Sequence, residues 1–148
     1  MSSADRTPAP RPAGIMFLAV VNWAAFVVTL AFWALVYVGR LVPPPGSLQS
    51  EVERANAAVT YGFMLGDVLY SAPLLLLAGV GLRRLRAWGW LAAQMANALW
   101  IYSMTVILLR DFYSRWSPGG LLFVPFAAVA VWAIPYLWRQ RRAFGVER

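Results

Sequence analysis

Four long apolar runs dominate the sequence, and polar or helix-breaking residues separate each run from the next. The first run, over residues 15–38, contains no charged side chain. About 20 helical residues cross the hydrocarbon core of a bilayer, whereas the apolar core of a signal peptide has about 7–15 residues. The first run is therefore expected to be a retained membrane-spanning helix. The four predicted helices are residues 15–38, 51–82, 88–109 and 121–138.

The segments between the runs carry signals that end or begin helices. Three prolines and a glycine at 43–46, and Ser-Pro-Gly-Gly at 117–120, cannot continue a helix. Ser50 followed by Glu53 fits a capping box, in which the two side chains bind each other's backbone N–H groups. The second helix is therefore expected to begin at the membrane surface and to enter the bilayer near Ala57.

The arginines are distributed unevenly between the two sides of the expected bundle. All thirteen basic residues are arginines, with nine on the side of the termini and of the short turn at 83–86, and four on the opposite side. Because cytoplasmic flanks carry the excess of basic residues, both termini are predicted to be cytoplasmic. Residues 1–14 and 139–148 are then expected to be a disordered tail and a basic tail, flanking a transmembrane domain at 15–138.

Composition narrows the class of protein. Apolar residues make up 61% of the 148 residues, against roughly 45–50% in soluble domains, so one lipid-embedded domain is expected. The net charge of +7 does not predict nucleic-acid binding, because the arginines lie between apolar runs and form no groove-reading stripe. The chain has no cysteine and no histidine, which excludes thiol nucleophiles, Cys or His metal sites, bis-His haem and Ser-His catalysis. No catalytic residue, metal or cofactor is predicted.

Asp67 is the one formally charged residue in the bilayer-embedded parts of the four predicted helices, with the second counted from Ala57, and it lies close to mid-membrane. An ionised carboxylate at that depth costs roughly 2.5–3.5 kcal/mol on insertion scales, so it is expected to face the bundle, to be paired or to be protonated. No arginine lies in these embedded parts to pair with it, since Arg40, Arg54 and Arg110 sit at the outer ends of the helices. We therefore predict a proton, cation or ligand site at Asp67, with a structural hydrogen bond between helices as the alternative.

Other polar residues at similar depth are candidates for the same site. Tyr70 shares a helix face with Asp67, because the two residues are three positions apart. Asn22 in the first predicted helix, and Gln94 and Asn97 in the third, could converge with them inside the bundle. The predicted ligand- or ion-binding residues are therefore Asp67, Asn22, Tyr70, Gln94 and Asn97. Alternatively these side chains only join helices, since such contacts contribute roughly 0.6–2 kcal/mol each in membranes.

Three residues of the second helix are candidates for helix packing. Gly62 and Gly66 form a G-x-x-x-G pair, which lets another helix approach closely. We expect that contact inside the bundle, with a homodimer as the alternative. Pro73 cannot donate to the carbonyl of Leu69 and is expected to kink the helix. Carbonyls freed in this way often line cavities, although an ordinary kink without a role in function is the alternative.

Residues 110–116 are the most mixed exposed segment of the sequence, with arginine, aspartate and aromatic side chains side by side. Arginine, tyrosine and tryptophan prefer the layer between lipid and water. We therefore predict an interfacial anchor just outside the third span, with recognition of an external molecule as the alternative.

Two short stretches carry a resemblance to other proteins. The sequence Gly-Asp-Val-Leu-Tyr-Ser-Ala-Pro at 66–73, and the segment 109–113 followed by Pro118, resemble those of small uncharacterised bacterial inner-membrane proteins with four helices. The resemblance covers roughly the second to fourth helices. It implies a multi-pass protein of the bacterial cell membrane, and it carries over no activity and no site residue. Small multidrug antiporters, by contrast, use a glutamate in their first helix, where this chain has no acid.

Two classes of function follow from these residues. The first is a protein that binds or transports a small molecule, an ion or a proton, with Asp67 as its intramembrane carboxylate. The second is a non-catalytic subunit for membrane interaction or assembly, in which the polar residues only hold helices together. The expected partners are the lipid bilayer and either a second copy of the chain or another membrane protein, and an enzyme is the least favoured class.

Overall fold

The computed structural model describes residues 12–113 and 120–146. Over these residues the chain is helical and forms no strand. The long helices are α1 (Ala13–Val38), α2 (Glu51–Gly66), α3 (Ala72–Arg83), α4 (Ala87–Tyr113) and α5 (Val124–Arg139). A π-helical turn, η2 (Asp67–Ser71), joins α2 to α3. The short 3-10 turns are η1 (Pro45–Ser47), η3 (Gly120–Phe123) and η4 (Arg141–Phe144).

Four helical stretches are long and apolar enough to cross a membrane, which confirms the predicted all-helical fold with four candidate spans. They are Ala13–Val38, Glu51–Arg83, Ala87–Tyr113 and Gly120–Arg139. The third stretch continues past its expected end at 109, so that Arg110 and Asp111 belong to α4. The second begins at Glu51 as expected, but Ser50 forms no side-chain cap bond.

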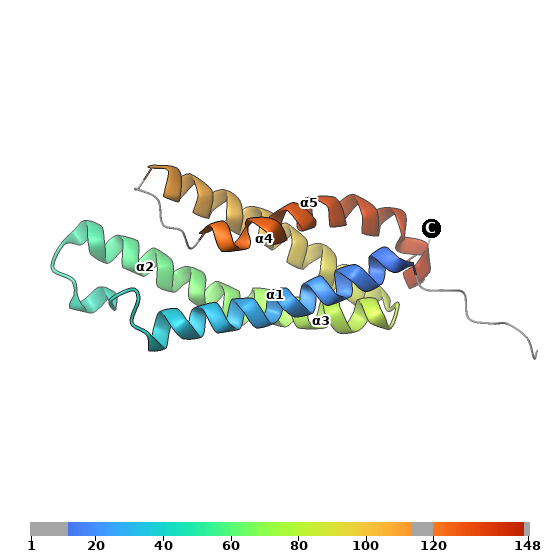
Figure 1. Ribbon diagram of the computed structural model, residues 1–148, viewed down its shortest axis with the longest axis horizontal. Helices are drawn as coiled ribbons and strands as arrows, with labels where there is room; N and C mark the ends of the chain where they lie inside the picture. Colours follow the sequence, from blue (N-terminus) through green and yellow to red (C-terminus); the bar gives the residue numbers. More distant parts are fainter. Residues whose placement is uncertain (1–11, 114–119, 147–148) are drawn as a thin grey trace, which may run out of the picture.

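One end of the bundle is closed by a compact apolar core. Figure 1 shows the start of α1, the turn between α3 and α4, and the C-terminal end of α5 gathered at this end. α3 packs against both α1 and α4, and α4 packs against α5. Phe144 of η4 joins this core, so part of the segment expected as a basic tail folds onto the bundle. We call this core the closed end; its buried residues are Ile15, Leu18, Ala19, Ala78, Leu82, Trp90, Ala92, Ala93, Ala133, Leu137 and Phe144.

At the opposite end the helices separate. α2 makes its main contacts with η1 and with its own continuation η2, and it diverges from α4 and α5 (Figure 1). Ala57 is the one buried residue of α2. This open end comprises α2, the last turns of α1 and α4, and η3. The space between these elements forms the cavity described below.

A wide helical turn precedes Pro73. Because proline has no backbone N–H and its ring crowds the carbonyl four residues earlier, it disfavours the regular α-helical hydrogen-bond pattern. The chain instead widens over Asp67–Ser71, where the N–H of Ala72 donates to the carbonyl oxygen of Asp67, five residues earlier. π-turns of this kind insert one extra residue into a helix and are frequent at functional sites. The turn begins at the same aspartate that the sequence singled out.

Close approach of helix backbones occurs at a different glycine pair from the one expected. A carbon atom added at Gly62 or Gly66 would meet no described atom within 4 Å, so neither glycine makes the expected contact inside the bundle. The homodimer alternative for this pair stays a prediction. At the closed end, by contrast, the backbones of Gly81 and Gly89 touch across the turn between α3 and α4, and a carbon added to either would overlap the other. The two glycines thus allow the shortest turn of the bundle.

Replacing one of the touching glycines should destabilise the protein. Gly89→Ala is expected to lower the free energy of unfolding by about 1–3 kcal/mol, because the new methyl group must displace the backbone of Gly81. Gly62→Ala, which meets open space, is the matched control, and it should leave stability unchanged or raise it by about 0.5–1 kcal/mol. Thermal unfolding of both variants in detergent measures the difference. Equal midpoints for the two variants would contradict the close contact.

Candidate ligand cavity

A cavity of about 450 Å³ occupies the open end of the bundle. Side chains of α1, α2, η2, α4 and η3 line it, together with the loop after α1. The lining extends from Ser71, deep in the second helical stretch, to Leu41 and Gly120 in the connections at the open end. Its volume lies within the roughly 300–1,000 Å³ typical of small-molecule sites.

Asp67 lies on the wall of this cavity. It is the central residue of the 33-residue stretch Glu51–Arg83 and the first residue of the wide turn. The indole Nε1–H of Trp33 donates to its Oδ2 at 2.9 Å, and the hydroxyl of Ser71 donates to its Oδ1 at 3.0 Å. A carboxylate offers about four lone-pair positions. Two donors therefore orient the group and leave capacity for a further donor from the cavity.

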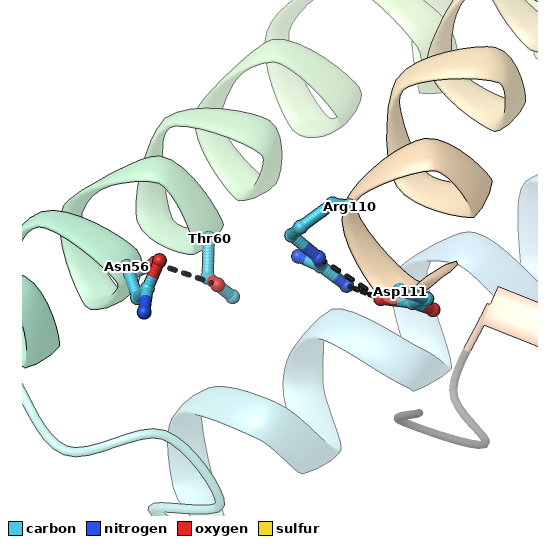
Figure 2. Close-up of polar contacts among 4 residues, drawn as sticks. All are labelled: Asn56, Thr60, Arg110 and Asp111. Carbon is cyan, nitrogen blue, oxygen red and sulfur yellow. Dashed lines mark hydrogen bonds and ion pairs between the residues drawn. The ribbon is translucent and has the colours of Figure 1, made fainter. Parts of the chain in front are cut away.

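A second acidic side chain of the cavity wall lies nearer the open end of the bundle. Asp111 is only 3% exposed, and its Oδ1 accepts from Arg110 Nη2 at 2.7 Å and from Nε at 3.0 Å. A carbon added at Gly120 would come within 2.7 Å of Asp111 Oδ2, so η3 covers this carboxylate closely. Figure 2 shows the ion pair of Arg110 and Asp111 on α4, and Asn56 and Thr60 on α2, and all four residues line the cavity.

The interfacial anchor predicted for residues 110–116 stays a prediction, and within this segment Asp111 is buried on the cavity wall beside Arg110. The sequence held a signal for this position. Trp100, Met104, Ile107 and Asp111 follow a spacing of four, three and four residues, and all four line the cavity. Phe112, on another face of the helix, is highly exposed, and residues 114–116 lie outside the described part of the chain.

One wall of the cavity is a continuous row of aromatic rings. Trp33 and Phe32 on α1 have ring centroids 4.9 Å apart, and Phe32 contacts Phe123 of η3 edge to face at 5.0 Å. Phe123 in turn lies 5.6 Å from the ring of Trp100 on α4. These edge-to-face and tilted arrangements are the favoured geometries of aromatic pairs. The row links three separate elements and begins at the residue that binds Asp67.

The other predicted site residues lie outside the cavity. Tyr70 is 65% exposed on the outer surface of the chain. The amide of Asn22 donates to the carbonyl of Leu18 on its own helix, at 2.7 Å. Gln94 Nε2 donates to the carbonyl of Ile134 on α5, at 3.2 Å, so this amide joins two helices. Asn97 is buried, and its Nδ2 has no hydrogen-bond partner within the described residues. Of the five predicted residues, Asp67 alone lines the cavity.

Neutralising Asp67 should not weaken the fold. In Asp67→Asn the amide oxygen can still accept from Trp33, and the amide NH₂ can donate to the hydroxyl of Ser71, so both contacts survive. The change also removes an ionisable group whose charged form is costly at this depth. We expect a thermal midpoint in detergent equal to or above that of the wild type from about pH 5 to pH 9. A variant that is clearly less stable at every pH would assign Asp67 a structural role instead.

Neutralising Asp111 should have the opposite effect. Asp111→Asn removes the charge that Arg110 pairs with in a buried setting, and it should destabilise the protein by about 1–3 kcal/mol. If the ion pair is the cause, Arg110→Gln combined with Asp111→Asn should cost less than the two single changes added together. Unfolding of the four proteins in the same detergent gives this coupling. Strict additivity would show that the pair contributes no mutual stabilisation.

Similarity to other proteins gives no assignment for this chain. No protein-family model matches it, and no curated protein and no solved structure matches it either. The inference about function therefore depends on the residues of the cavity and on their chemistry.

Proposed function

We propose that the chain is a multi-pass membrane protein that binds or transports a small molecule, an ion or a proton, with Asp67 as the carboxylate that contacts this ligand. The observation that carries this proposal is the position of the carboxylate. It occupies the middle of a candidate span and lies on the wall of a cavity of about 450 Å³. A carboxylate that only joined two helices would need no such space beside it, and intramembrane acids commonly mark substrate or ion pathways.

The proposed orientation has both termini in the cytoplasm of a bacterium and the open end facing outward. The excess of arginine near the termini and near the turn at 83–86 supports this orientation. In it, the cavity is reached from the outside, and the closed end separates it from the cytoplasm. Ile15, Leu18, Leu82 and Leu137 are fully buried there and would form an apolar barrier to water and ions.

The alternative is a subunit for membrane assembly, and one observation supports it. Most of α2 is exposed, and the positions next to Gly62 and Gly66 are open. Such a surface could receive a helix of a second copy or of another membrane protein. In that case the cavity at the open end would be filled by lipid or by the partner, and water-soluble reagents would not reach its wall.

Cysteine labelling separates the two functions, because the natural chain contains no cysteine. Ser103→Cys places a thiol on the cavity wall, and Ala93→Cys places one in the fully buried core of the closed end as the matched control. A membrane-impermeant cationic thiosulfonate added outside intact cells should label the first variant and spare the second. An unlabelled Ser103→Cys protein that still folds, shown by an unchanged elution volume and thermal midpoint, would favour the assembly function. Labelling from the cytoplasmic face alone would overturn the proposed orientation.

A further inference from the structure

We propose that the ligand of the cavity is a lipophilic organic cation, an amine or a quaternary onium ion with apolar substituents. This inference rests on the proposed function and adds the chemical class of the ligand. It is drawn from the charge, the aromatic row and the shape of the cavity.

The charge of the cavity favours a cation. Its wall carries two carboxylates and one guanidinium, those of Asp67, Asp111 and Arg110. Arg110 and Asp111 form an ion pair on this wall, so their two charges offset each other. Asp67 is bound by two neutral donors, the indole of Trp33 and the hydroxyl of Ser71. An ionised carboxylate in a low-dielectric site is stabilised by a nearby positive charge, and an anionic ligand would be repelled by it.

The aromatic row favours an organic cation over an inorganic one. Faces of tryptophan and phenylalanine attract ammonium groups through the ring quadrupole, and aromatic cages bind quaternary ammonium ligands in this way. Trp33, Phe32, Phe123 and Trp100 provide such a row beginning at the carboxylate. Inorganic cations such as calcium need about six to eight oxygen ligands. No three Asp or Glu side chains come together in the part of the chain that the structure describes.

The arrangement also predicts how the ligand is oriented in the cavity. The cationic centre would lie beside Asp67 and Trp33, near the middle of the span. The apolar substituents would extend along the aromatic row toward Phe123 at the open end. Ligand binding in this pose uses the carboxylate for charge and the rings for shape, so both parts should be needed for affinity.

The test compares tetraphenylphosphonium with tetraphenylborate, which have nearly the same shape and opposite charge. Binding of each radiolabelled ion to the full chain in lipid nanodiscs is measured by equilibrium dialysis, with empty nanodiscs as the blank. Saturable binding of the cation and none of the anion is the expected result. Asp67→Asn should weaken binding of the cation about tenfold or more, and Asp67→Glu should retain part of it. Trp100→Leu should weaken binding severalfold through loss of one aromatic face.

Glu53→Gln is the matched control for charge. It removes one carboxylate from the same helical stretch, at an exposed position outside the cavity, and should leave the affinity for tetraphenylphosphonium unchanged. Equal affinity for the two ions, equal affinity of wild type and Asp67→Asn, or no saturable binding up to about 1 mM of the cation would each overturn the inference. If Ser103→Cys is nevertheless labelled from outside, the proposed binding function stands with another class of ligand. If it is not labelled, both proposals fail.

Discussion

The structure depends first on how closely α3 and α4 approach each other at their connecting turn. Gly81 and Gly89 bring two backbones into contact there, and a side chain on either residue would force the helices apart. Alanines continue this close packing along the closed end, where Ala78, Ala93 and Ala133 are fully buried. With the helices held at one end, their divergence at the other is possible without loss of the core. The cavity therefore lies at the end of the bundle opposite the close contact between Gly81 and Gly89.

The wide turn at Asp67–Ser71 connects this packing to the chemistry of the cavity. Pro73 cannot donate to the regular hydrogen-bond pattern, and the chain widens before it, where the N–H of Ala72 donates to the carbonyl of Asp67. The turn sits where the closely packed α3 gives way to the splayed α2. Asp67 is thus held at a change of helix geometry, with both of its carboxylate oxygens bound by neutral donors.

The sequence was sufficient to predict the four candidate spans and to single out Asp67, because both depend on local composition. The length of four apolar runs and the presence of one acid in the middle of a run can be recognised without knowing which face of each helix points into the bundle. The partners of Asp67 could not be read in the same way. Asn22 donates a hydrogen bond within its own helix, and Gln94 donates one to α5. Both side chains lie on helix faces that do not line the cavity. Asp111 was missed because arginines flank it at 110 and 115 and made a helical segment resemble a loop.

The position of Asp67 at the centre of its candidate span has a consequence for the energetics of any charged ligand. One elementary charge that crosses the whole bilayer gains or loses about 2.3 kcal/mol per 100 mV of membrane potential. A cation that enters from the outside and stops at the middle residue of the 33-residue stretch would cross about half of that field. A potential of about 100 mV, negative inside, would then strengthen its binding by about 1.2 kcal/mol, or roughly sevenfold. Occupancy of the cavity would follow the voltage of the cell, a dependence that liposomes with imposed potassium diffusion potentials would reveal and that a neutral ligand would lack.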